Sequence, residues 1–178
     1  MSGHSKWSTI KHKKAANDSV KGSVFTKMAK AISIAVKKSG GVGDPNKNSS
    51  LRLAIDKARA VNMPRDNIDR AIAKGMGKGA GEELVELTIE AFAPEGVGVI
   101  AEVVTDSRNR VVAELRSIIE KHGGSMGEPG SVGYMFDKVD SGYRPKYRVT
   151  VTDQKRVEEF LDILREHEDV QEIYANLG

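Results

Sequence analysis

The hydrophobic pattern of this chain changes its period at a glycine-rich segment, GMGKGAG, which occupies residues 75–81. Before this segment apolar residues recur at helical spacing, and after it they alternate in short runs typical of strands. Because each pattern must bury an apolar face, we predict a basic helical bundle at residues 1–79 and an α+β domain with an antiparallel sheet at residues 80–178. The glycine-rich segment follows a helix and lacks the Gly-Lys-Ser/Thr ending of a phosphate loop, so we interpret it as a flexible hinge.

Three helices are predicted in the first half. The first covers residues 24–38, and its apolar stripe consists of Phe25, Met28, Ala29, Ile32, Ala35 and Val36. The segment SGGVGDPNKNSS interrupts it, and the serines of this segment are candidates to cap a second helix that begins at Leu51. Pro64 is well placed near the start of a third helix. Lysine and arginine residues lie off the apolar stripes, which predicts a bundle with a cationic surface.

The second half combines strands with two helices. LVELTIEAF and VGVIAEVV flank a turn, APEG, and predict a hairpin. Amphipathic helices are predicted at RNRVVAELRSIIEKHGG, ended by its glycines, and at VEEFLDILREH. Further strands are expected at SVGYMF, YRVTV and DVQEIYANL. We therefore expect an antiparallel sheet with both helices on one face.

The two halves also differ in the sign of their charge. Residues 1–79 contain 17 Lys+Arg and 5 Asp+Glu, a net charge of +12, whereas residues 80–178 contain 11 and 20, a net charge of −9. Such asymmetry suggests that the first half meets a polyanion. The alternative is that the two halves neutralise each other within the fold, and the two interpretations are compatible.

Composition narrows the cellular context. The sequence has no cysteine, which excludes disulfides, thiolate catalysis and Cys-ligated metals. No apolar run approaches the ~20 residues that span a bilayer, and the first residues match neither a secretory signal nor a myristoylation site. We expect a cytoplasmic protein without a membrane partner.

Metal binding and catalysis are not indicated. The four histidines show no ligand spacing, and His122 beside Gly123 is better explained as a helix C-terminal cap. The sequence contains no nucleophile elbow, HExxH, Walker or Rossmann pattern. Its adjacent acids, such as Glu158 and Glu159, do not share a helix face. We predict no enzyme, no metal site and no cofactor.

Nucleic-acid binding is the class of function that the residues favour. The opening stretch, MSGHSKWSTIKHKKAAND, sets the only tryptophan among lysines and histidines, with a single acid. Lysines neutralise phosphates and release counterions, and an aromatic side chain stacks on an unpaired base with ~1–3 kcal/mol. We expect an irregular tail that reaches into the target, although Trp7 could instead pack into the bundle. The candidate nucleic-acid-binding residues are His4, Lys6, Trp7, Lys11, His12, Lys13, Lys14, Lys27, Lys30, Arg65, Arg70, Arg108 and Arg110.

Arg108 and Arg110 belong to a second short motif, TDSRNR, at the start of a predicted helix. Asp106 or Ser107 can cap that helix, and positive charge in its first turn opposes the helix dipole. Arginine at such a position can bind phosphate or a carboxylate. The equally open alternative is a local ion pair of Arg110 with Asp106 or with Glu114.

These segments resemble the YebC/PmpR family of bacterial proteins, which includes mitochondrial translational activators. The resemblance rests on GHSKWSTIKHKKAAND, FTKMAKAI, LRLAIDKARAVNMPRDNIDRAIAKG, TDSRNRVVAELR, GSVGYMF and DVQEIYANL, in this order. It implies a helical domain and two α+β domains, with the third inserted into the second. This sequence passes directly from GSVGYMFDKV to SGYRPKYRVTV, so we expect the inserted domain to be missing and residues 140–145 to form a short bridge.

The resemblance implies a regulator of gene expression. Family members are classed as DNA-binding transcriptional regulators, and a second view holds that they act on the ribosome and relieve stalled translation, for example at proline runs. We therefore predict a non-enzymatic, nucleic-acid-binding regulator, with DNA or ribosomal RNA as its partner. The alternative is an RNA-binding, ribosome-associated translation factor. A monomer is favoured, and we hypothesise that the acidic domain faces protein or covers the basic domain when no target is bound.

Overall fold

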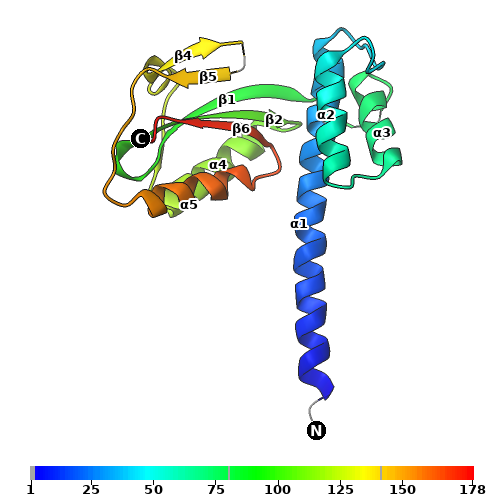
Figure 1. Ribbon diagram of the computed structural model, residues 1–178, viewed down its shortest axis with the longest axis horizontal. Coiled ribbons are helices and arrows are strands. Elements are labelled where there is room, and N and C mark those ends of the chain that lie inside the picture. Colours follow the sequence, from blue (N-terminus) through cyan, green and yellow to red (C-terminus); the bar gives the residue numbers. More distant parts are fainter. Residues whose placement is uncertain (1–2, 80, 141) are drawn as a thin grey trace. The chain divides into compact units, whose positions relative to one another are not determined.

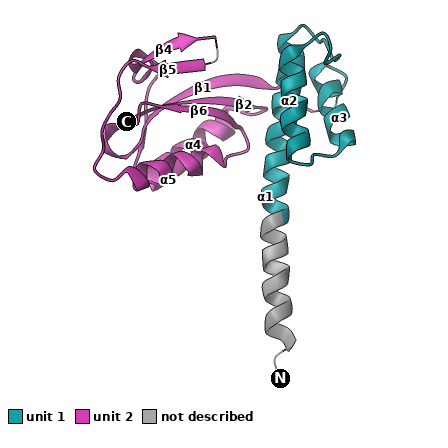
Figure 2. Ribbon diagram, viewed as in Figure 1, with its two compact units in different colours: residues 1–79 teal, residues 80–178 magenta. Residues whose placement is uncertain are grey.

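The computed structural model describes the backbone of residues 3–79, 81–140 and 142–178, and within these ranges it describes the side chains from Asp18 on. The chain divides into two compact units, unit 1 (residues 1–79) and unit 2 (residues 80–178) (Figure 2). This boundary falls where the net charge changes sign. Unit 1 is helical, and unit 2 combines helices with antiparallel strands, which confirms the predicted fold class.

In the described part of unit 1, helices α2 (Ser49–Ala60) and α3 (Arg65–Gly75) pack against α1 (Gly3–Lys38) (Figure 1). The stripe predicted on α1 is confirmed, because half of it is buried and the other half packs against the core. The prediction that this helix begins at residue 24 is wrong, since the described part is already helical at Asp18. The buried core of unit 1 consists of Ile32, Ala35, Val36, Leu51, Ala54, Ile55, Ala58, Met63, Ile68 and Ala71.

Asn48 joins the end of α1 to the start of α2. Its side-chain oxygen accepts a hydrogen bond from the Leu51 N–H at 3.0 Å and so caps α2. Its amide nitrogen donates to the Ala35 carbonyl, the Ser39 hydroxyl and the Val42 carbonyl at 3.1, 2.8 and 3.1 Å. The serines that the sequence suggested as caps are instead the first two residues of the helix, because the buried asparagine satisfies both helix ends at once.

Close backbone packing holds α3 on α1. The buried Ser33 hydroxyl donates to the Ala71 carbonyl at 2.7 Å. A Cβ atom on Gly75 would lie 2.6 Å from the Ser33 carbonyl oxygen, so only glycine permits this approach. Gly75 is therefore a packing residue at the end of α3, whereas the sequence assigned it to the flexible hinge at 75–81.

Unit 2 contains an antiparallel sheet in the order β3-β1-β2-β6. The hairpin of β1 (Val85–Phe92) and β2 (Gly98–Thr105) is confirmed, as is the closing strand β6 (Val170–Ala175), and β3 (Ser125–Met126) adds a short edge. Helices α4 (Arg108–Lys121) and α5 (Gln154–Arg165) cover one face of the sheet, as predicted (Figure 1). The core between them consists of Ala91, Ala93, Val97, Val99, Ala101, Val103, Val111, Leu115, Ile119, Val157, Phe160, Leu161, Leu164 and Val170.

A second, two-stranded sheet covers part of the opposite face. It is formed by β4 (Phe136–Val139) and β5 (Gly142–Pro145) (Figure 1). Side chains alternate between the faces of a strand, so Ile100 points away from its neighbours Val99 and Ala101 and meets Val132, Met135 and Phe136 beneath this hairpin. A small second core therefore fixes the hairpin to the sheet.

Three predictions in this region are wrong. SVGYMF forms a 3-10 turn (Gly133–Met135) before β4 rather than a strand, and the expected bridge at 140–145 contains β5. YRVTV is not a strand either, because Val149 makes only an isolated bridge with Leu177. The first two segments pack around the second core beneath the hairpin, whereas Val149 and Val151 pack against the main core. Such distant contacts leave no clear periodic pattern in segments this short.

Candidate nucleic-acid interface

The outer faces of α2 and α3 carry the cations of unit 1. On α2 the residues Leu51, Ala54, Ile55 and Ala58 are buried, and Arg52, Lys57 and Arg59 are exposed on the remaining surface. Arg65 and Arg70 are likewise exposed on α3, as predicted from the sequence. The amphipathic spacing of both helices determines this arrangement, since the apolar stripe faces α1 and leaves the charged residues in water.

Carboxylates within unit 1 compensate only a minority of these charges. Arg59 lies 3.9 Å from Asp56, and Arg65 lies 3.7 Å from Asp69, and all four side chains are largely exposed. Such pairs contribute about 0–1 kcal/mol and are easily exchanged for another anion. The cations of unit 1 outnumber its acids by 17 to 5, so its net charge remains +12.

Arg70 is held against its own helix. Its Nε donates to the Asp66 carbonyl at 3.3 Å, and its Nη2 forms a short hydrogen bond with the Asn67 side chain. The residue remains exposed. It is therefore oriented near the start of α3 and remains accessible to a phosphate.

Lys30 differs from the prediction. Its exposed fraction is 8%, so it does not belong to the accessible cationic surface, and Lys27 is half-buried. Lys30 precedes the buried Ser33 by one helical turn, and residues at this spacing share one side of a helix. The buried side of α1 is therefore wider than its apolar stripe indicates.

The candidates of the opening stretch lie outside the described side chains. The bounds of α1 begin at Gly3, where the sequence predicted an irregular tail. The structure describes side chains only from Asp18 on, so the assignments in this stretch stay predictions. They concern His4, Lys6, Trp7, Lys11, His12, Lys13 and Lys14.

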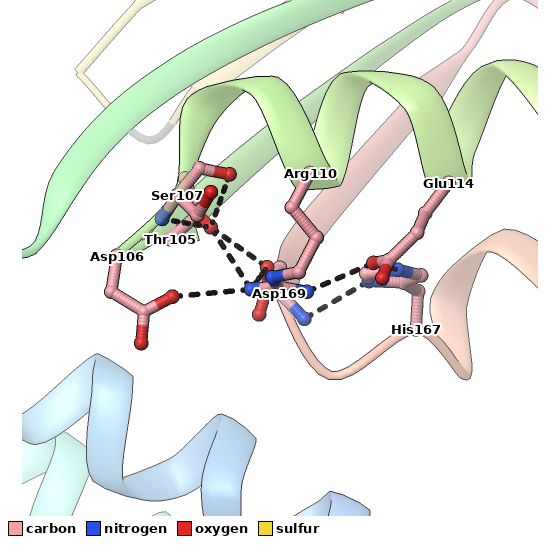
Figure 3. A network of polar contacts seen from close by, with 7 residues as sticks. All are labelled: Thr105, Asp106, Ser107, Arg110, Glu114, His167 and Asp169. Atoms are coloured by element: carbon pink, nitrogen blue, oxygen red, sulfur yellow. Dashed lines mark hydrogen bonds and ion pairs between the residues drawn. The ribbon is translucent and has the colours of Figure 1, made fainter.

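Arg110, in unit 2, is surrounded by carboxylates (Figure 3). Its guanidinium lies 3.2 Å from Asp106, 2.9 Å from Glu114 and 2.8 Å from Asp169. Burial lowers the pKa of Arg110, but hydrogen bonds and opposite charges from these carboxylates outweigh burial and raise the pKa above its ordinary value. The alternative of local ion pairing is confirmed, and Arg110 holds the fold rather than presenting a free phosphate site.

Asp169 connects this cluster to the end of β2. Its carboxylate is fully buried and accepts hydrogen bonds from the Thr105 hydroxyl at 2.9 Å and from Arg110 (Figure 3). His167 bridges the same region, since its Nδ1 accepts from the Asp169 N–H and its Nε2 lies 3.1 Å from Glu114. This network ties the start of α4 to the segment before β6.

Arg108 occupies a different position on α4. It is exposed, and it lines a shallow groove along the outer face of the helix together with Arg116 and Lys121. Of the two arginines in the TDSRNR motif, Arg108 is therefore the exposed one, whereas Arg110 is engaged by three carboxylates.

The sequence reasoning overlooked two exposed tyrosines beside the β4–β5 hairpin. Tyr134 and Tyr147 have exposed fractions of 61% and 48%. For Tyr147 the signal was present in YRPKYR at residues 143–148, where tyrosines are interleaved with basic residues, whereas Tyr134 lies outside this stretch. Basic residues with interleaved aromatics are typical of surfaces that bind single strands.

The part of the chain that the structure describes contains neither a membrane-spanning helix nor a cluster of metal ligands. None of its helices is long and apolar enough to cross a membrane. Among the same residues, no group of three or more His, Cys, Asp and Glu side chains could hold a metal ion.

The fold and the charges define a two-unit protein in which a cationic helical bundle precedes an acidic α+β unit. The chain belongs to the TACO1/YebC family: residues 5–78 match the model of the TACO1/YebC protein N-terminal domain, and residues 84–141 match that of the TACO1/YebC second and third domain.

Relatives named "Probable transcriptional regulatory protein" are more than half identical to this chain. One from Brachyspira hyodysenteriae is 55% identical over 138 residues, which cover 78% of this chain and 56% of the relative. Another from Chlorobaculum parvum is 52% identical over 153 residues, covering 86% of this chain and 60% of the relative. The chain thus spans somewhat more than half the length of these relatives.

A solved structure shares the fold. The crystal structure of the conserved hypothetical protein Aq1575 from Aquifex aeolicus superposes with a TM-score of 0.77 at 28% sequence identity. The superposition covers 88% of this chain and 90% of that chain.

Proposed function

We propose that this protein is a non-enzymatic regulator of gene expression that binds nucleic acid through the cationic surface of unit 1. The observation that carries the proposal is that residues 1–79 contain 17 cations but only 5 acids, and that arginines are exposed on the outer faces of α2 and α3. A surface of this kind attracts a polyphosphate chain by releasing its counterions, whatever the base sequence. The printed names of the relatives support a role in transcriptional regulation.

The proposal extends to the cellular setting. The protein acts in the cytoplasm as a monomer and needs neither a cofactor nor a metal. Arg108 adds a contact from unit 2, because it is exposed at the first turn of α4. The hinge after α3 gives the two units freedom to engage a target, and the inserted third domain of the family is absent near residues 140–145.

Binding of the full chain to a labelled DNA duplex over a series of salt concentrations tests the proposal. We expect the logarithm of affinity to fall with the logarithm of salt by a slope of about −0.9 for each phosphate neutralised. The double variant Arg52→Glu/Arg59→Glu should weaken binding at low salt by about ten-fold or more and reduce the slope by about two.

The matched control is Lys155→Glu/Arg165→Glu, which makes the same charge change on the exposed surface of α5. Affinity in the control should stay within about two-fold of the wild type, because these side chains lie in the acidic unit. Wild-type protein without salt-dependent affinity for DNA, RNA or ribosomes would contradict the proposal.

Translation is the second candidate. Exposed cations of unit 1 are distributed over three helices, with Lys37 and Lys38 on α1, Arg52 and Arg59 on α2, and Arg65 on α3. This distribution suits the broad phosphate surface of folded RNA better than a single duplex groove, which one recognition helix usually enters. Co-sedimentation with ribosomes that survives DNase but not high salt would favour translation, whereas tight sequence-selective duplex binding without ribosome association would favour transcription.

A further inference from the structure

The β4–β5 hairpin and its flanks, residues 134–148, carry a net positive charge although they belong to the acidic unit 2. Unit 2 has a net charge of −9, yet this segment contains four cations and two acids. The cations are Lys138, Arg144, Lys146 and Arg148, and all four are exposed. A local reversal of charge on an acidic unit is a favourable position for an anionic ligand.

Two tyrosines at the open end of the hairpin face solvent. Tyr134 and Tyr147 are 61% and 48% exposed. Partial desolvation and the neighbouring Tyr134 raise the pKa of Tyr147, so the Tyr147 ring stays uncharged at neutral pH. Tyr143 and Tyr174 behave differently, because they pack edge to face at 5.4 Å against the core beneath the hairpin.

The backbone that presents the exposed tyrosines is rigidly held. The Glu90 carboxylate accepts hydrogen bonds from the N–H groups of Gly130, Val132 and Gly133 at 2.8, 2.6 and 2.8 Å. The Lys146 N–H donates to the Met135 carbonyl at 2.9 Å, which extends the pairing of β4 and β5 toward the two rings. A platform that is ordered before it binds loses little conformational entropy on binding.

The neighbouring cations are only loosely neutralised. Asp137 is shared by Arg144 at 3.7 Å and Lys146 at 4.0 Å, and all three side chains are exposed. One carboxylate therefore serves two cations, in contacts that contribute about 0–1 kcal/mol each. Arg148 is oriented next to Tyr147 by a hydrogen bond of 2.7 Å to the Leu177 carbonyl.

From this arrangement we propose that the surface of residues 134–148 is a second nucleic-acid site, which binds single strands. Tyr134 and Tyr147 stack on unpaired bases, and Arg144 and Lys146 contact the phosphates between them. The site rests on the proposed function, and it specifies an unpaired strand as the form of nucleic acid that unit 2 contacts. An acidic peptide would use the cations but leave the two aromatic faces uncovered, whereas bases use both.

The test is binding of the full chain to a labelled oligo-uridine and to a labelled duplex of equal length. We expect Tyr134→Ala/Tyr147→Ala to weaken binding of the oligo-uridine about ten-fold or more and to leave the duplex within about two-fold. The variant Tyr134→Phe/Tyr147→Phe keeps both rings and should bind as the wild type does. Tyr143→Phe, on the inward-facing ring, is the matched single-ring control. Unfolding curves of the Tyr134/Tyr147 variants should coincide with that of the wild type, because both of these rings are exposed.

The outcomes separate this proposal from the previous one. If the wild type binds neither the duplex nor the oligo-uridine, both the proposed function and the hairpin site are refuted. Duplex binding that depends on Arg52 and Arg59, together with unchanged single-strand binding in Tyr134→Ala/Tyr147→Ala, would overturn only the hairpin site. If Tyr134→Ala/Tyr147→Ala weakens binding of the duplex and of the oligo-uridine equally, the hairpin site is also overturned. The same holds if a labelled oligo-glutamate binds the wild type as tightly as the oligo-uridine does and binds this variant less tightly.

Discussion

The guanidinium of Arg110 lies 2.8 Å from the carboxylate of Asp169, a fully buried side chain 59 positions further along the chain. A buried carboxylate is stable only when it is paired and hydrogen-bonded. Arg110 and Thr105 together supply these contacts, and they fasten the first turn of α4 to the strand that closes the sheet. The cluster thus stabilises the fold, although its arginine has the sequence context of a phosphate ligand.

Replacing Arg110 by Met should lower the free energy of unfolding by about 2 kcal/mol, since the buried Asp169 loses its positive partner. Urea unfolding followed by circular dichroism measures the change. Arg108→Met is the matched control, because Arg108 is exposed two positions away and its loss should cost less than about 0.5 kcal/mol. Equal destabilisation by both variants would show that the ion cluster does not matter for stability.

The lowered pKa of Glu90 predicts that the stability of the fold depends on pH. Burial raises the pKa of Glu90, but its three hydrogen bonds from backbone N–H groups outweigh burial and lower the pKa below 4.5. A carboxyl group with a lowered pKa in the folded state stabilises the fold above its unfolded pKa and loses that effect as pH falls through the folded pKa.

The variant Glu90→Gln should therefore be less stable than the wild type by about 1–3 kcal/mol at neutral pH. The difference should begin to shrink as pH falls below the unfolded pKa of about 4.5, and it should be lost once pH passes below the lower folded pKa, where the wild-type carboxyl is protonated in both states. Unfolding curves recorded across the acidic range measure it. A difference that stays constant down to the lowest pH would contradict the assignment.

Gly75 tests the packing of α3 on α1. In Gly75→Ala the added Cβ would lie 2.6 Å from the Ser33 carbonyl oxygen and 2.7 Å from the Val36 Cβ, so we expect a loss of about 1–3 kcal/mol. Gly22→Ala is the control, because Gly22 lies in α1 with no atom within 4 Å of a new Cβ. That change should stabilise the protein by up to about 1 kcal/mol, and thermal unfolding should show opposite shifts. Shifts of the same sign would mean that the close approach is not limiting.

Asn48 is expected to be the most sensitive polar residue of unit 1. Asn48→Ala removes the cap of α2 and leaves one buried and one partly buried carbonyl without this donor, which should cost about 2 kcal/mol or more. Ser49→Ala replaces an exposed residue in the first turn and should cost less than about 0.5 kcal/mol. If the serine variant proves the more damaging of the two, the cap is assigned to the wrong residue.

Local patterns predicted much of the fold. The helical stripe of Ile32, Ala35 and Val36, the β1–β2 hairpin and the two helices on one face of the sheet all follow from periodicities of 3.6 and 2 along short segments. The change of charge sign at the boundary of the units is likewise a property of composition. These features are readable because each depends on neighbours within one or two turns or strand pairs.

Contacts between distant residues determined the rest. Lys30 is buried although its residue type favours the surface, Arg110 is engaged by a carboxylate 59 positions away, and β4 and β5 form over a second core around Ile100. None of these contacts leaves a periodic trace, since burial and pairing arise only when remote segments pack together. Chain composition therefore predicted a protein built to meet phosphates, whereas packing selected which of its cations remain exposed to do so.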